Sequence, residues 1–141
     1  MKKFNFRFER ILKLRERQED LLKQELSALV AKKNTYLSKV EDLKNSLEQV
    51  FENWRQHHKF NPQEKEFQDN FALAIKNDIY RNNLIVKEYD IKIRKKREEL
   101  LINRKKLKTL LKLQEKAQER YWYEVSLEER KEMDEIASNQ K

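Results

Sequence analysis

The chain contains no glycine and a single proline among its 141 residues. These two residue types form most of the tight turns at which strands and short helices reverse direction. A β-sheet or a multi-layer globular domain needs such turns at every corner, which argues against both. Charged residues make up 41% of the chain and hydrophobic residues 38%, as is typical of long helices and coiled coils. The sequence therefore predicts an all-α fold.

Two long segments carry seam residues whose spacing alternates between four and three. The first seam consists of Phe8, Leu12, Arg15, Glu19, Leu22, Leu26, Leu29, Lys33, Tyr36, Val40, Leu43, Leu47, Val50 and Trp54. The second consists of Ala72, Ile75, Ile79, Asn82, Val86, Tyr89, Ile93, Lys96, Leu100, Asn103, Leu107, Leu110, Gln114, Ala117 and Tyr121. A sustained heptad period predicts two helices wound around each other as a coiled coil. Asn82 and Asn103 are seam residues of the type that fixes register or partner.

The seams are separated by one break in the pattern, around residues 57–64. There Asn61 can cap a helix, Pro62 suits a first helical position, and Glu64 fits a capping box. We expect helix one from about Phe8 to His57, a turn near residues 57–61, and helix two from Pro62 to about Ala137. A short connection makes the helices antiparallel neighbours, with position i facing roughly 120 − i. The expected protein is one antiparallel hairpin domain over residues 1–141, monomeric when free.

Helix two is expected to outrun helix one, which leaves about 25 C-terminal residues as an overhang without an intramolecular partner. This overhang contains Tyr121, Trp122 and Tyr123. Adjacent residues point around the whole circumference of a helix, so one seam cannot bury all three aromatic rings. We interpret them as a contact surface for another molecule.

A second aromatic group, comprising Trp54, Phe60, Phe67 and Phe71, lies around the turn. One interpretation is a hydrophobic plug that closes the end of the hairpin. Phe71 is adjacent to Ala72 and thus out of phase with the second seam, so at least one phenylalanine should lie off it. The alternative is therefore an exposed anchor for a partner protein.

Basic residues concentrate in the stretch 87–116, which holds 12 Lys or Arg against 5 Asp or Glu and accounts for most of the net charge of +8. This basic belt fits nucleic acid, an anionic membrane, an acidic protein, or simple solvation of a long helix. Two alternative functions follow from the sequence. The belt favours nonspecific binding to nucleic acid or to a membrane surface, and the overhang favours a homo-oligomeric structural coiled coil.

The sequence offers no catalytic, cofactor or metal site. His57 and His58 are the only histidines, and as neighbours on a helix they face about 100° apart and cannot share a metal. No serine has a histidine beside it, and without cysteine or glycine there is neither a thiol nucleophile nor a phosphate-binding loop. We predict a non-enzymatic protein without a small-molecule substrate. No apolar run is long enough to cross a bilayer, and no signal segment opens the chain, so a cytosolic location is expected.

Both ends of the chain resemble the FliJ family, a coiled-coil stalk protein of the flagellar type III export machine. The opening pattern of Phe4, Phe6 and Phe8 leads into a leucine-rich helix that carries Arg15 and Glu19. The closing run from Arg130 to Ala137 alternates basic and acidic residues and contains an Asp-Glu pair followed by two small or apolar residues. Between the ends, the length, the heptads and the central turn agree with the family.

The resemblance implies a cytoplasmic stalk whose paired terminal helices insert into a hexameric export ATPase at the inner face of the cell membrane. It also implies contact with the membrane protein of the export gate and with export chaperones. For the ATPase ring we expect contacts from Phe4, Phe6, Phe8, Tyr121, Trp122, Tyr123, Lys131, Asp134 and Glu135. For the gate we expect contacts from Trp54, Phe67, Phe71 and Ile75. Nucleic acid is not an expected partner of such a stalk.

Overall fold

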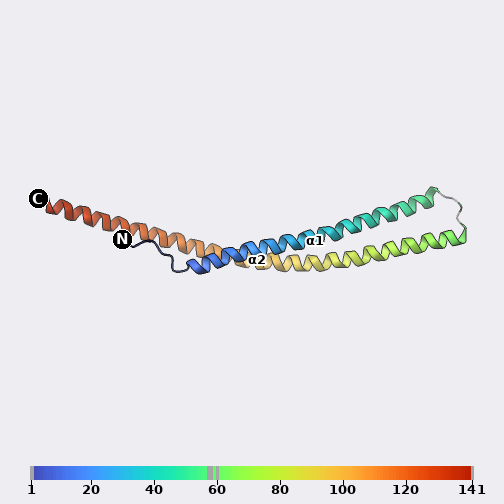
Figure 1. Ribbon diagram of the computed structural model, residues 1–141, viewed down its shortest axis with the longest axis horizontal. Coiled ribbons are helices and arrows are strands. Elements are labelled where there is room, and N and C mark those ends of the chain that lie inside the picture. The colour runs from blue at the N-terminus through green and yellow to red at the C-terminus, as the bar shows by residue number, and fades with distance from the viewer. Residues whose placement is uncertain (1, 57–58, 60, 141) are drawn as a thin grey trace. The chain divides into compact units, whose positions relative to one another are not determined.

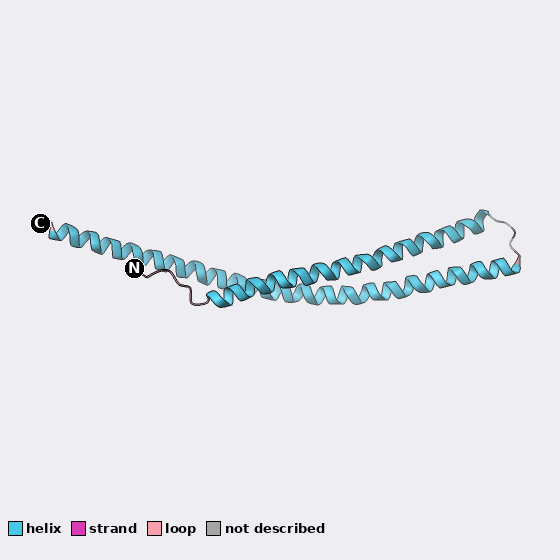
Figure 2. Cartoon of the chain, in the orientation of Figure 1, coloured by secondary structure: helices cyan, strands magenta, loops and turns pink. Residues whose placement is uncertain are grey.

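The computed structural model describes residues 2–56, 59 and 61–140. All regular structure in these residues is helical: α1 spans Glu9–Gln56 and α2 spans Pro62–Asn139. The two helices pack against each other, and the described part of the chain contains no strand (Figures 1 and 2). The all-α fold predicted from the missing glycines is therefore confirmed. His57, His58 and Phe60, which belong to the expected turn, lie outside the described residues.

The chain divides into two compact units. Lys23–Glu98 form the connecting unit, which holds the end of α1 and the beginning of α2. Met1–Leu22 and Glu99–Lys141 form the terminal unit, which holds the N-terminal arm, the beginning of α1 and the end of α2.

The first turn of α2 is capped as the sequence predicts. The backbone N–H of Glu64 donates a hydrogen bond of 2.8 Å to the side-chain oxygen of Asn61. Pro62 occupies the first helical position, where the amide that proline lacks would have no partner. The side chain of Asn61 thus replaces one of the backbone acceptors missing at the start of a helix.

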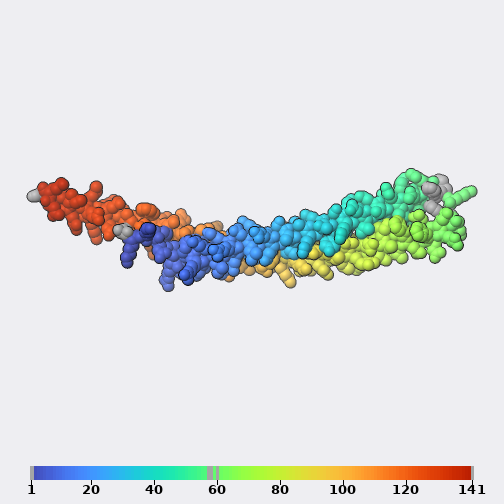
Figure 3. All heavy atoms as spheres, in the orientation of Figure 1, coloured from blue at the N-terminus to red at the C-terminus, as the bar shows by residue number. Residues whose placement is uncertain are grey.

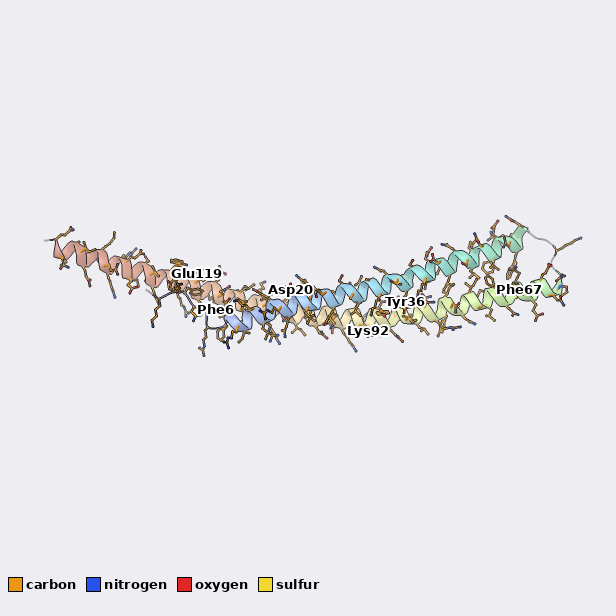
Figure 4. The ribbon with its side chains drawn as sticks, viewed as in Figure 1. Phe6, Asp20, Tyr36, Phe67, Lys92 and Glu119 are labelled. Carbon is orange, nitrogen blue, oxygen red and sulfur yellow. The ribbon has the colours of Figure 1, made fainter. Side chains whose placement is uncertain are left out.

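The connecting unit has a core of small and aliphatic side chains. Val50, Ala72 and Ile75 are buried together, and the partly buried Leu43, Leu47, Trp54 and Ile79 pack against them. Farther along, the rings of Tyr36 and Tyr89 stack with centroids 5.7 Å apart; Figure 4 labels Tyr36.

Two ion pairs show the direction and register of the helices in this unit. Lys33 Nζ lies 2.6 Å from Asp90 Oδ1, and Lys96 Nζ lies 2.7 Å from Glu25 Oε2. The partner number falls as the α1 number rises, so the two segments run antiparallel. Folding about residue 60 gives Lys87 as the residue opposite Lys33 and Lys95 as the residue opposite Glu25, so the approximate register is confirmed to within three residues. The exact pairs depend on how the two seams interdigitate.

The terminal unit is also antiparallel but contains polar seam contacts. Asn103, only 4% exposed, donates from Nδ2 to the backbone oxygen of Arg15 at 3.0 Å, and Arg15 donates back to Asn103 Oδ1 at 3.5 Å. Beside this pair, Arg104 Nε donates to Glu19 Oε1 at 2.9 Å. Leu12 and Leu100 supply buried apolar side chains to the same unit.

Every residue of both predicted seams is buried or half-buried, which confirms the heptad assignment. Asn82 and Asn103 were both expected to fix the register between the helices. Asn103 makes an interhelical contact of that kind, and Asn82 does not. Asn82 donates at 2.8 Å to the backbone oxygen of Asp78, one turn earlier in its own helix. An asparagine can satisfy its amide on its own helix, so it specifies register only where the facing helix presents a partner.

Candidate protein-binding surfaces

The N-terminal arm lies against α2 within the terminal unit. The hydroxyl of Tyr121 donates a hydrogen bond of 2.8 Å to the backbone oxygen of Lys2, and the rings of Phe4 and Tyr121 are 5.5 Å apart. Phe6 is buried and makes an edge contact of 5.8 Å with Phe8. Among the predicted ring-contact residues, Phe4, Phe6, Phe8 and Tyr121 therefore hold the arm in place.

Trp122 and Tyr123 differ from their neighbour Tyr121. Each is 66% exposed, whereas Tyr121 is half-buried under the arm. The Trp122 ring meets the Tyr121 ring edge-on at 5.3 Å, so the indole is supported on one side. A large aromatic side chain that is supported but exposed is typical of residues that anchor protein interfaces.

The remaining predicted ring-contact residues lie on the last turns of α2. Lys131, Asp134 and Glu135 are exposed, as is every described residue from Ser126 to Gln140 (Figure 3, red end). Met133 and Ile136 are apolar members of this stretch and are exposed as well. The stretch therefore has polar and apolar side chains available for contact.

The predicted gate residues divide into two kinds. Ile75 is buried and Trp54 packs against the same core, where its ring contacts Phe51 at 5.3 Å. Phe67 and Phe71 are 69% and 48% exposed (Figure 4 labels Phe67). The plug interpretation is wrong for both phenylalanines, because their heptad positions turn them away from α1. Phe60, the fourth member of the group, lies outside the described residues.

Sequence reasoning missed one apolar stripe on α2 in the connecting unit. Leu73, Tyr80, Leu84 and Ile91 are exposed, and their spacing of seven, four and seven places them on one face of a helix. That face points away from the seam. The same periodicity test that found the seams would find this stripe, if applied to the residues left over after the seams are assigned.

Several residues of the basic belt make contacts within the chain. In the connecting unit, Lys96 pairs with Glu25, and Lys92 lies 5.2 Å from the ring centroid of Tyr89. In the terminal unit, Arg104 pairs with Glu19. The two histidines considered as metal ligands lie outside the described residues, and within those residues no cluster of candidate metal ligands occurs. None of the described helices is long and apolar enough to span a membrane.

Comparison with known proteins identifies the family of the chain. The family model described as Flagellar FliJ protein matches residues 4–140, nearly the whole chain. No curated protein and no solved structure gave a significant match. Because the family model covers the arm, both helices and their connection, the chain belongs to the FliJ family, whose members are components of flagellar export.

Proposed function

We propose that the chain is a non-enzymatic stalk of the flagellar type III export apparatus. In this proposal it is a single hairpin whose α2 overhangs the start of α1. Its terminal unit inserts into the hexameric export ATPase, and its connecting unit contacts the membrane protein of the export gate. Export chaperones are its further partners, and it works at the cytoplasmic face of the cell membrane.

The exposed pair Trp122 and Tyr123 carries this proposal. A stalk inside a ring must be narrow and must also expose side chains that the ring can bind. Two antiparallel helices supply the narrow rod, and α2 presents the aromatic pair on its outer surface. Lys131, Asp134 and Glu135 extend the contact with charged groups that suit the polar rim of an interface.

The arm positions this surface. Phe4 packs on Tyr121, and the Tyr121 hydroxyl donates to the Lys2 carbonyl, so the arm that carries Phe4, Phe6 and Phe8 adds to the ring contact beside Trp122. For the gate, the exposed Phe67 and Phe71 make the contact, while Trp54 and Ile75 hold the helices beneath them.

The proposal is tested by replacing Trp122 with alanine and titrating the variant against the export ATPase. A central aromatic anchor contributes about 2 kcal/mol or more, which corresponds to roughly thirtyfold weaker binding. The melting temperature should stay close to that of the wild type, because two thirds of the side chain is already exposed. Tyr80→Ala is the matched control, since Tyr80 is an equally exposed aromatic residue of α2 in the other unit. Equal ATPase affinity of both variants and the wild type would refute the ring contact.

A further inference from the structure

The terminal unit has two flanks, one on each side of its seam. We number the seam residues as heptad positions a and d, with Leu12 and Leu100 at a positions. In an antiparallel pair of helices, the e positions of both helices border one side of the seam, and the g positions border the other. Glu19, at an a position, pairs with Arg104, at an e position, on the e side. The b positions lie beyond the e positions, and the c positions lie beyond the g positions.

The two flanks differ in charge. The e and b positions carry both signs, since Glu16 and Asp20 are acidic and Lys108 is basic. The g and c positions, with the f positions at their edge, contain no acidic residue within residues 10–21 of α1 and 102–116 of α2. We call this surface the basic flank. Its basic residues, all exposed, are Arg10, Arg17, Lys105, Lys106, Lys112 and Lys116.

The basic flank also carries exposed aliphatic side chains along its length. They are Ile11, Leu14, Leu21, Ile102 and Leu113, which are between 43% and 55% exposed. An apolar band beside the a and d positions is typical of helices that pack against a further helix. Because these five residues come from both helices, a partner that lies along the flank covers them together.

The charge of the basic flank is not neutralised from within the chain. In the part of the chain that the structure describes, none of its six basic residues takes part in an ion pair. Clustered like charges repel one another, and they attract a surface of opposite sign. The flank therefore combines an apolar band with an electrostatic preference for an acidic partner.

We infer that the basic flank is a docking site for an amphipathic helix of an acidic partner protein. The apolar stripe of the partner helix packs on the five aliphatic residues, and its glutamate and aspartate side chains pair with the lysine and arginine residues around them. Residues 102–116 cover roughly 21 Å of α2, so a helix of about 14 residues matches the flank. The flank contains neither Trp122 nor Tyr123, so the inference does not depend on the proposed ring contact.

Position and chemistry favour a helix over the other anionic partners that suit the basic belt. A flat bilayer meets the outermost c and f positions, whereas Ile11, Lys106 and Leu113 occupy g positions beside the seam, which the side chains of a third helix reach. Nucleic acid is bound mainly through its phosphates, and phosphate contacts leave the aliphatic side chains without an apolar partner. An acidic amphipathic helix satisfies the apolar and the basic residues together.

A pair of designed peptides tests the inference on the full-length protein. The acidic probe is a helical peptide of about 18 residues, with leucine along one face and glutamate on both sides of that face. The basic probe is the same peptide with lysine in place of glutamate. In fluorescence anisotropy, the acidic probe should bind with a dissociation constant below about 100 μM, and the basic probe at least about tenfold more weakly. Added salt should weaken binding of the acidic probe, because exposed charge pairs are screened.

Two pairs of nearby residues on α2 provide matched variants. Ile102 and Leu101 are 55% and 54% exposed, but only Ile102 belongs to the basic flank. Ile102→Ala should weaken binding of the acidic probe about fivefold or more, and Leu101→Ala should change it less than about twofold. Lys106→Glu should weaken binding at least about tenfold, whereas Lys108→Glu, at a b position on the other flank, should change it less than about threefold. Circular dichroism should show equal helix content in all four variants.

The inference is overturned if the acidic probe does not bind at about 100 μM, or if the two members of each pair of variants bind it equally. Two other occupants would also overturn it. A wild type with a sedimentation mass near twice 17.5 kDa, which becomes a monomer in Ile102→Ala, would place a second copy of the chain on the flank. A wild type that binds anionic phospholipid vesicles but not the acidic probe, and loses the vesicles in Lys106→Glu, would place a lipid surface there.

Discussion

In the connecting unit the seam closes on aliphatic side chains around Val50, whereas in the terminal unit it crosses a polar layer formed by Arg15 and Asn103. In the connecting unit the seam residues Lys33 and Lys96 reach out of the seam to Asp90 and Glu25, with which they form ion pairs. In the terminal unit the Asn103 side chain bonds to the α1 backbone itself. A buried amide with one available partner specifies alignment more strongly than an exposed ion pair does.

The two units also differ in what they leave uncovered. The connecting unit exposes Phe67, Phe71 and a short apolar stripe on α2, and Leu37 on α1. The terminal unit exposes aromatic, apolar and charged residues on both helices, including Trp122 and Tyr123, next to a non-helical arm.

The largest effect on stability should come from the apolar seam itself. Replacing the buried Leu12 with alanine should lower the free energy of unfolding by about 3 kcal/mol, because the helices cannot fully close over the lost side chain. Ile11→Ala, which changes an exposed neighbour, should cost less than about 0.5 kcal/mol. Urea denaturation followed by circular dichroism measures both. Equal losses for the two variants would mean that the seam has been assigned to the wrong face.

A smaller effect should distinguish the two seam asparagines. Asn103→Ala removes both hydrogen bonds that join Asn103 to Arg15 across the seam and leaves space at a buried position, which should together cost about 1.5 kcal/mol. Asn82→Ala breaks only a bond within its own helix and should change stability by less than about 0.5 kcal/mol. The same denaturation experiment compares them. A loss at Asn82 as large as that at Asn103 would remove the contrast between the units.

The smallest effect should appear at the start of α2. Asn61→Ala removes the cap on the Glu64 amide and should cost about 1 kcal/mol. Asn61→Ser, which keeps a capping oxygen, should recover most of that loss. If thermal melts of both variants match the wild type, the cap contributes nothing to the connecting unit.

The sequence predicted the helices and the buried residues well because a coiled coil follows from local spacing. Each residue from Phe8 to Trp54 in the first seam, and from Ala72 to Tyr121 in the second, is buried or half-buried as its heptad position requires. Capping by Asn61 was predictable for the same reason, since it involves residues only three apart. The register was not predictable to the residue, because it depends on how two distant seams interdigitate.

The contacts between the arm and α2 could not be predicted from the sequence. Three phenylalanines in alternation mark the arm as unusual, but nothing local indicates that Phe6 becomes buried while Phe4 packs on Tyr121. The phase of Phe71, which is adjacent to the seam residue Ala72, indicates a position off the seam, whereas the sequence around Phe67 fits a plug and an anchor equally. Whether Phe67 and Phe71 are buried depends on where they lie relative to the seam. That can be decided only when the position of the facing helix is known.

The central claim is that the two units bind different partners, and a two-by-two binding measurement tests it directly. The affinities of Trp122→Ala and Phe67→Ala would each be measured for the export ATPase and for the cytoplasmic part of the export gate. Trp122→Ala should weaken ATPase binding roughly thirtyfold and leave gate binding unchanged, and Phe67→Ala should do the reverse. If either variant weakens both interactions equally, or neither variant weakens any, the division of function between the terminal and connecting units is wrong.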